Sequence, residues 1–180
     1  TLPIIRQRMG MVFQNPDDQL FMTTVYDDVA FGPRNYKLTE QEVEKRVLEA
    51  LEMVGILHLK DRAPFKLSGG EKRAAAIATV LAMQPDILVM DEPSTALDPK
   101  SRRRLMNLLK SFEHTKIITS HDLDMVYELC TRTIVIKNGE IAADGPTSEI
   151  LVNAELLDDC GLEMPLALQG CPVCGVKGVK

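Results

Sequence analysis

The chain has 180 residues, a net charge of −5 and 45% hydrophobic residues, enough to build the core of one ordinary domain. The acidic balance argues against broad nucleic-acid binding, because nucleic acids attract basic surfaces. No stretch approaches the roughly 20 apolar residues that cross a bilayer, and no apolar block follows Arg6 and Arg8 as it would in a signal peptide. Four cysteines do not make a disulfide scaffold at this length, so we expect a reducing, cytoplasmic setting.

The first predicted elements are a strand and a capped helix. Branched and aromatic residues make 4–13 β-like, and an Asn-Pro turn signal ends this strand. Residues 16–36 are acidic and are predicted to be irregular, with apolar residues interspersed. Thr39 and Glu42 form a capping box that begins a helix, which Gly55 ends.

A second capped helix leads into a buried strand. Ser68 and Glu71 form the capping box of this helix. The fully apolar run Ile87–Met90 is typical of a strand that is buried on both faces, as in a parallel sheet. The remaining predicted elements are a helix over 100–112, a strand over 116–119, a helix over 123–130, and strands over 133–137 and 140–143. The last two strands flank Asn138-Gly139, a hairpin signal. This alternation predicts an α/β fold with the sheet in the middle.

Two adjacent carboxylates, Asp91 and Glu92, follow the predicted buried strand. The carboxyl end of such a strand opens into the crevice where α/β sheets bind ligands. Since neighbouring strand residues point in opposite directions, one carboxylate can serve a Mg²⁺ ion while the other faces an attacking water. The alternative is a plain acidic pair at the start of a helix that follows a core strand.

Two glycines, Gly69 and Gly70, stand in the first turn of the second capped helix. They leave backbone N–H groups open to an anion, and the helix dipole favours negative charge there. A simple capped helix start explains Ser68 and Glu71 equally well. It does not explain the two glycines, because glycine is a poor helix former.

Five motifs resemble those of ABC-transporter ATPases and occur in the order of that family. They are the signature motif at Leu67–Glu71, the Walker B strand with its catalytic Glu at Ile87–Pro93, the D-loop at Ser94–Asp98, the switch histidine at His121 and the Q-loop glutamine at Gln14. The resemblance covers about residues 4–160 and implies a P-loop-NTPase-like α/β domain with a helical subdomain. We expect a partial ABC ATPase domain over 1–165, with the helical, signature-bearing subdomain over about 16–84 and a disordered tail over 166–180.

A finer resemblance points to the energy-coupling-factor branch, the importers of cobalt, nickel and vitamins. Phe13–Phe21, Val25–Pro33 and the turn Gly145–Thr147 carry it. It implies an ATP-binding and ATP-hydrolysing subunit at the cytoplasmic face of the membrane, where it acts as a homo- or heterodimer with another ABC ATPase subunit and binds an integral-membrane component. Residues 16–33 would face that component, or their aromatic residues would simply seal a small satellite core. The sequence does not name the transported substrate.

The resemblance also implies roles for residues that handle ATP and Mg²⁺ within one subunit. Glu92 would be the general base or would polarise the attacking water, and Asp91 would hold Mg²⁺, usually through water. Gln14 would contact the metal or the attacking water. His121 would touch the γ-phosphate and sense its loss.

A second set of residues would act across the dimer. In this family ATP is hydrolysed between two subunits that are arranged head to tail. The signature residues Ser68, Gly69 and Gly70 would contact ATP bound mainly to the other subunit. Asp98 would cross the dimer interface.

The phosphate-binding loop Gly-x-x-x-x-Gly-Lys-[Ser/Thr] does not occur in the chain. In the family this loop lies several tens of residues before the Q-loop, whereas about a dozen residues precede Gln14 here. We consider a fragment that lacks the N-terminal strands and the loop, one half of a split subunit, and a non-hydrolysing partner that only donates its signature motif. We favour the fragment, because the missing part is contiguous while the other motifs are intact.

The last predicted feature is a cysteine pair, Cys171 and Cys174. Its spacing fits half of a zinc knuckle, but no second pair or nearby His completes a site. We expect a disordered, redox-sensitive tail rather than a metal site.

Overall fold

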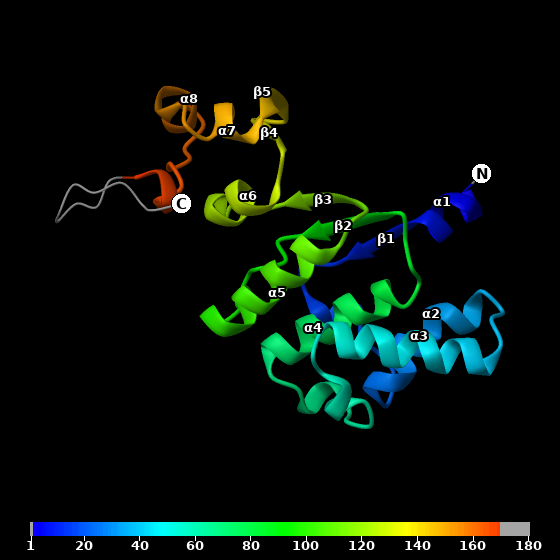
Figure 1. Cartoon of the computed structure of the whole chain (residues 1–180). Helices are drawn as coiled ribbons and strands as arrows, with labels where there is room; N and C mark the ends of the chain where they lie inside the picture. The colour runs from blue at the N-terminus through cyan, green and yellow to red at the C-terminus, as the bar shows by residue number, and fades with distance from the viewer. Residues whose placement is uncertain (1, 170–180) are drawn as a thin grey trace. The chain divides into compact units, whose positions relative to one another are not determined.

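The computed structural model describes residues 2–169. These residues divide into two compact units, and the boundary in the sequence falls between Thr119 and Ser120 (Figure 1). We describe each unit by itself.

The first unit contains a three-stranded parallel sheet in the order β1-β2-β3. Its strands are β1 (Met9–Val12), β2 (Ile87–Asp91) and β3 (Thr115–Thr119). The middle strand β2 buries Leu88 and Met90 completely, whereas Ile87 and Val89 on its other face are half-buried, so the predicted core strand is confirmed but full burial of both faces is not. Parallel pairing is also confirmed, since Val12 pairs with Met90, and Asp91 with Thr119.

The predicted strand over 4–13 is wrong for most of its length. Only Met9–Val12 is a strand, and Leu2–Arg8 forms the short helix α1. The pairing of β1 with β2 begins at Met9, opposite Ile87, so the preceding residues have no strand beside them in the part of the chain that the structure describes. Their backbone groups therefore bond locally, as in a helix.

The segment that was predicted to be irregular, 16–36, contains the helix α2 (Val25–Asn35), preceded by the 3-10 turn η1 (Pro16–Asp18). Thr24 caps α2 by accepting a hydrogen bond from the backbone N–H of Asp27. The acidic residues lie in the first turn, where the helix dipole favours them. The prediction failed because this composition suits a helix start as well as a loop.

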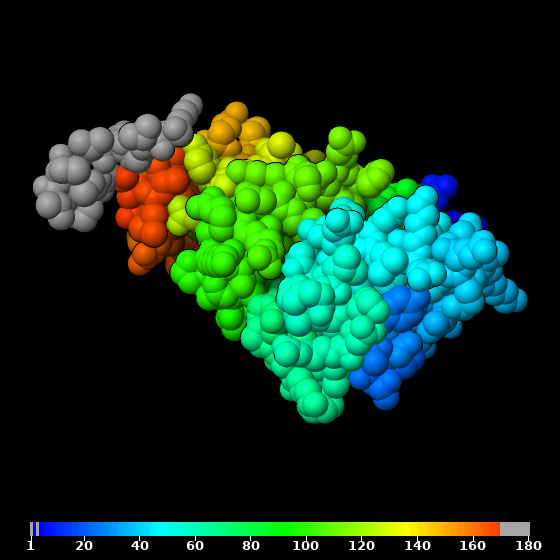
Figure 2. All heavy atoms as spheres, turned by 60° about the horizontal axis from the view of Figure 1, so that its bottom comes forward, coloured from blue at the N-terminus to red at the C-terminus, as the bar shows by residue number. Residues whose placement is uncertain are grey.

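Helices α2, α3 (Glu40–Met53) and α4 (Gly69–Leu81) pack on one another, and α4 also packs on β1. Figure 2 shows the face where their blue, cyan and teal segments form one continuous surface. Both predicted capping boxes are confirmed, at Thr39 for α3 and at Ser68 for α4. The 3-10 turns η2 (Leu57–Leu59) and η3 (Pro64–Lys66) join these two helices, and α5 (Pro99–Ser111) lies between β2 and β3 in the sequence.

The second unit is built on an antiparallel hairpin. Its elements are α6 (Leu123–Leu129), β4 (Arg132–Lys137), β5 (Glu140–Pro146), α7 (Thr147–Ile150), α8 (Ala154–Asp159) and the 3-10 turn η4 (Leu166–Leu168). Asn138 and Gly139 make the predicted turn, with φ of +53° and +84°. Val126, Leu151 and Leu157 form the core of the unit.

Two sequence predictions concern the end of the chain and the membrane. Residues 166–168 of the predicted tail form η4, whereas 170–180, including Cys171 and Cys174, lie outside the described residues. Between Leu2 and Gln169, no helix combines the length and the apolar character needed to cross a bilayer.

Candidate functional site

The carboxyl edge of the sheet gathers three of the predicted site residues. Because β1 and β2 are parallel, with Val12 opposite Met90, both strands end at the same edge. Gln14 follows β1 there, while Asp91 ends β2 and Glu92 comes next. Ligands of open α/β sheets bind at this edge.

Asp91 is held by the neighbouring strand. The hydroxyl of Thr119 in β3 donates a hydrogen bond to Oδ1 of Asp91. The Asp91 side chain is half-buried, so one carboxylate with a fixed orientation faces the edge of the sheet. Sequence reasoning missed Thr119, because no local spacing links it to Asp91.

Glu92 has a left-handed backbone, with φ of +45°. This conformation costs a non-glycine residue about 1–2 kcal/mol. Three hydrogen bonds hold it: the Glu92 N–H donates to the Thr119 carbonyl (3.0 Å), the Thr95 N–H donates to the Glu92 carbonyl (3.2 Å), and the Thr95 hydroxyl donates to Glu92 Oε2 (3.4 Å). Strained residues of this kind occur most often at functional sites.

The start of α4 is shaped by its own residues. Glu71 Oε2 accepts hydrogen bonds from the backbone N–H of Ser68 (2.7 Å) and from its hydroxyl (2.8 Å). Ser68 Oγ in turn accepts one from the Glu71 N–H (3.4 Å). The bonds from the Ser68 backbone and hydroxyl hold the pKa of Glu71 below its usual value.

The two glycines of α4 have different surroundings. A Cβ built on Gly69 would meet no atom within 4 Å, whereas one on Gly70 would lie 2.8 Å from Ser101 Oγ. Ser101 belongs to the first turn of α5 and donates its hydroxyl to Asp98 Oδ2 (2.6 Å). Close packing therefore explains Gly70, and Gly69 opens the helix start to its surroundings.

Asp98 is the N-cap of α5. Its Oδ1 accepts hydrogen bonds from the N–H groups of Lys100 (2.9 Å) and Ser101 (3.1 Å). The Ser101 hydroxyl, together with these N–H groups, lowers the pKa of Asp98. Gly70 and Asp98 also line one cavity of about 250 Å³. The structure thus brings these two predicted site residues together.

Two comparisons with known proteins decide the family. A protein-family model described as ABC transporter matches residues 1–95. An ABC transporter ATP-binding protein of Geobacter sulfurreducens is 66% identical over 175 residues, which are 97% of this chain and 70% of that protein. The chain belongs to the ABC transporter ATP-binding family. Its relatives include the energy-coupling factor transporter ATP-binding protein EcfA of Methanothermobacter thermautotrophicus, which is 48% identical over 89% of this chain and 53% of its own length.

Two solved structures of the ABC family have the same fold. CbiO1 from Clostridium perfringens, described as part of the ABC transporter complex CbiONQ, is 43% identical with a TM-score of 0.75, over 86% of this chain and 63% of that one. The dimeric ATP-binding cassette MJ0796, bound to ADP and Pi, is 31% identical with a TM-score of 0.72, over 81% of this chain and 66% of that one. The chain therefore spans less than two thirds of either structure, and the predicted α/β ABC ATPase fold is confirmed.

Gln14, which the sequence predicts to be the Q-loop glutamine, is exposed. Its backbone carbonyl accepts a hydrogen bond from the buried Arg73 of α4 (2.5 Å). Burial lowers the pKa of the Arg73 guanidinium, and the negative charge of Asp91 acts in the opposite direction. Sequence reasoning did not single out Arg73, although a charged residue inside an Ala-rich helix is a signal that could have found it.

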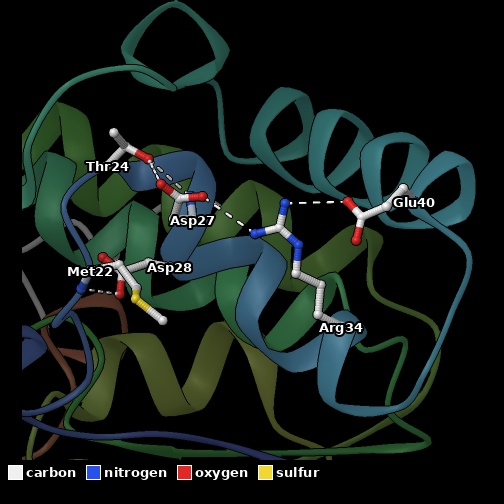
Figure 3. A network of polar contacts seen from close by, with 6 residues as sticks. All are labelled: Met22, Thr24, Asp27, Asp28, Arg34 and Glu40. Carbon is white, nitrogen blue, oxygen red and sulfur yellow. Dashed lines mark hydrogen bonds and ion pairs between the residues drawn. The ribbon is translucent and has the colours of Figure 1, made fainter.

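The segment 16–33 of this ABC family member is tied together by polar contacts (Figure 3). Asp28, buried in α2, accepts hydrogen bonds from the N–H groups of Phe21 (2.9 Å) and Met22 (3.0 Å). Burial raises the pKa of Asp28. Phe21 and Phe31 pack edge to face, with ring centroids 5.0 Å apart, yet they remain 64% and 40% exposed. These two rings form an apolar surface patch.

A second set of contacts fastens α2 to the start of α3. The side chain of Arg34 reaches Asp27 Oδ1 at 3.4 Å and Glu40 Oε2 at 3.3 Å (Figure 3). Thr24 donates its hydroxyl to the other oxygen of Asp27 (2.7 Å). Tyr26, the third aromatic residue of the segment, is half-buried.

His121, the predicted switch histidine, lies in the second unit, just before α6. It is exposed, and the next residue, Asp122, caps α6 by accepting a hydrogen bond from the Met125 N–H (3.0 Å). The Asp122 N–H donates to the Ser120 hydroxyl (3.1 Å). These contacts define a tight turn around His121.

Proposed function

We propose that this chain acts in a subunit that binds and hydrolyses ATP to energise an ABC-type importer. The observation that carries the proposal is the carboxyl edge of the sheet, where the oriented Asp91 ends β2, the strained Glu92 comes next and Gln14 follows the neighbouring strand β1. Phosphoryl transfer needs mainly positioning and electrostatic stabilisation, and these groups supply both.

Mg²⁺ fits the donors at this edge. Mg²⁺ prefers oxygen ligands, few of them from the protein, and Asp91 and Gln14 offer a carboxylate and an amide oxygen. The Thr119 hydroxyl orients the Asp91 carboxylate, as outer-shell partners of metal ligands do. Bound Mg²⁺ would neutralise the charge that develops on the phosphates. Glu92 is the general base or water-polarising residue in this proposal.

In the same proposal, the start of α4 contacts ATP that is bound to a second subunit. Ser68, Gly69 and Gly70 contact ATP held by another ABC ATPase subunit, and the open space around Gly69 supports this role. Asp98 lies next to Gly70 and contacts the partner in the dimer. His121 senses the γ-phosphate. Closure of the homo- or heterodimer on Mg-ATP is the step that drives transport.

The relatives support a particular importer type. EcfA proteins of two organisms are 46% and 48% identical, and the CbiO1 structure is 43% identical. We propose that the cargo is a metal ion such as cobalt or nickel, or a vitamin, and that the subunit is peripheral at the cytoplasmic face of the membrane. The exposed pair Phe21 and Phe31 supports contact between 16–33 and the integral-membrane component.

A narrower function is also supported. The chain could act as a partner that only donates its signature motif to a complete subunit. The observation that favours it is again the open helix start, which is preformed by the Ser68–Glu71 capping box and needs no residue of another chain.

ATP hydrolysis separates the two functions. We would measure it for the chain alone and for the chain mixed with a complete EcfA-type subunit, in wild type, Glu92→Gln and Ser68→Ala. If the chain hydrolyses ATP itself, Glu92→Gln lowers its rate by about 10²–10⁴-fold, the usual contribution of a general base. If it only donates the signature, the mixture depends on Ser68 and not on Glu92. A hydrolysis rate that neither Glu92→Gln nor Ser68→Ala changes would contradict both functions. Glu113→Gln, an exposed acidic residue after α5, is the matched control.

A further inference from the structure

Arg73 connects the signature helix to the loop that carries Gln14. It lies in α4, one turn after Gly69, and is only 4% exposed. Its Nη1 donates to the Phe13 carbonyl (2.7 Å) and its Nη2 to the Gln14 carbonyl (2.5 Å). One guanidinium therefore holds two successive peptide units just beyond the end of β1.

Three further contacts join the same two segments. Gln19 Nε2 donates to the Ala76 carbonyl and to the Thr79 hydroxyl of α4, both at 2.8 Å. Lys72 of α4 pairs with Asp17 at 2.6 Å. Within the loop, Gln19 Oε1 accepts a hydrogen bond from the Phe13 N–H (3.2 Å). The loop over 13–19 is thus fastened to α4 at both of its ends.

Stability alone does not explain a buried arginine at this position. Removing a charge from water is expensive, and an apolar side chain of similar volume often serves the core as well or better. Arg73 is buried without a carboxylate in hydrogen-bond contact among the described residues, and its Nε has no hydrogen-bond partner there either. What the guanidinium provides, and an apolar side chain cannot, is a fork that fixes two carbonyl groups at once.

We propose that Arg73 is a positioning residue that couples the start of α4 to the Gln14 loop, so that the signature motif and Gln14 move together. The proposal rests on the function proposed above. When another subunit engages Ser68 and Gly70, α4 moves as a rod, because it is one unbroken helix from Gly69 to Leu81. Arg73 passes this displacement to the Gln14 backbone.

Hydrogen exchange measured by mass spectrometry tests the coupling. The samples are the full chain alone and the full chain mixed with a complete EcfA-type subunit and Mg-ATP. In wild type, we expect mixing to slow exchange both at 67–71 and at 13–19. In Arg73→Met, we expect slowing at 67–71 only. A purely structural Arg73 would change exchange in the free chain but would leave both segments responding to the partner.

The free chain provides a second, independent measurement. Loss of one or two charge-assisted hydrogen bonds should speed exchange at 13–19 by at least roughly tenfold in Arg73→Met, while 75–81 of α4 keeps its protection. Arg73→Lys, which can reach one carbonyl, should restore part of the effect. Arg46→Met on α3 is the matched control and should leave 13–19 unchanged.

Each outcome decides something. If mixing with the partner subunit still slows exchange at both 67–71 and 13–19 in Arg73→Met, the coupling is overturned. If Arg73→Met leaves the rate of hydrogen exchange at 13–19 in the free chain unchanged, the positioning role is overturned as well. If the partner slows nothing at 67–71 even in wild type, the proposed contact between subunits fails, and the free-chain comparison still decides whether Arg73 positions the loop.

Discussion

The start of α4 and the turn after β2 both carry residues of the proposed site, but their hydrogen bonds span very different distances along the chain. At the start of α4, the bonds join Ser68 to Glu71, three residues apart. In the turn, Asp91 and Glu92 are bound to Thr119 of another strand, and Glu92 and Ala96 have left-handed backbones. The first arrangement is made by local chemistry, whereas the second is imposed by the sheet.

This difference predicts which substitutions disturb the start of α4 and which disturb the turn after β2. The capped helix start should persist when the sheet is weakened, because its hydrogen bonds join residues of the same helix start. The turn should lose its shape as soon as β2 and β3 shift against each other. The following predictions test this division, beginning with the largest expected effect.

Removing core volume beneath the turn should have the largest effect. Leu88→Ala deletes a completely buried side chain of β2 and should lower the free energy of unfolding by about 2–5 kcal/mol. Urea unfolding, followed by circular dichroism, measures this. Ile117→Ala on β3, where the side chain is 50% exposed, is the control and should lower the free energy of unfolding by only about 1 kcal/mol, because half of the deleted apolar surface is already in water. Equal losses would mean that β2 is not the support of the turn.

Adding volume at the contact between the two regions comes next. Gly70→Val should cost about 1–3 kcal/mol, because its Cβ would lie 2.8 Å from Ser101 Oγ and would disturb the bond from Ser101 to Asp98. Gly69→Ala, one residue earlier, meets nothing within 4 Å and should be neutral or slightly stabilising. The pair can be compared by thermal unfolding. A Gly70→Val chain as stable as Gly69→Ala would refute the close packing.

Relieving strain in the turn should have a smaller effect of opposite sign. Ala96 is exposed with φ of +61°, so Ala96→Gly should raise the free energy of unfolding by about 0.5–1 kcal/mol, the left-handed cost less the extra entropy of the unfolded chain. Ala74→Gly, inside α4, should lower it by about 1 kcal/mol. If both substitutions destabilise, the turn is not strained at Ala96.

The smallest effect concerns pH. Because the folded state lowers the pKa of Glu71, the capping box stabilises the fold above the ordinary pKa of the carboxyl group and loses this contribution as the pH falls through the lowered pKa. Glu71→Gln should therefore be less stable than wild type at neutral pH, and the gap should close as the pH falls through the lowered pKa of Glu71. Unfolding curves at a series of pH values measure the gap. A gap that widens in acid would contradict the assignment.

The same division explains what the sequence could predict. Both capping boxes, the core strand Ile87–Met90 and the Asn138-Gly139 turn depend on residues close together in the sequence, and all of them are confirmed. The N-terminal strand was predicted too long, because its length is set by where β2 begins, far along the chain. Helix α2 was missed because its acidic first turn has the composition of a loop.

The proposed site was predictable to the same extent. Its motif residues could be found from the sequence, because each motif is a short run. Their partners could not: Thr119 reaches Asp91 from the neighbouring strand, Ser101 occupies the space left by Gly70, and Arg73 bonds to carbonyl groups 59 and 60 residues earlier. Backbone carbonyls have no side-chain identity, so a sequence pattern cannot reveal that an arginine binds them.

The pairing of β1 with β2 has a consequence for how the chain folds. Met9 pairs with Ile87, so α2, α3 and α4 all lie between two strands that must meet. The entropy of closing such a long segment must be overcome before the pairing contributes any stability, whereas the helices form from local contacts. We therefore expect β1 to join the sheet late, after the helical layer has collapsed. Until then the edge of β2 is exposed, and the nascent chain is most vulnerable to aggregation during that interval.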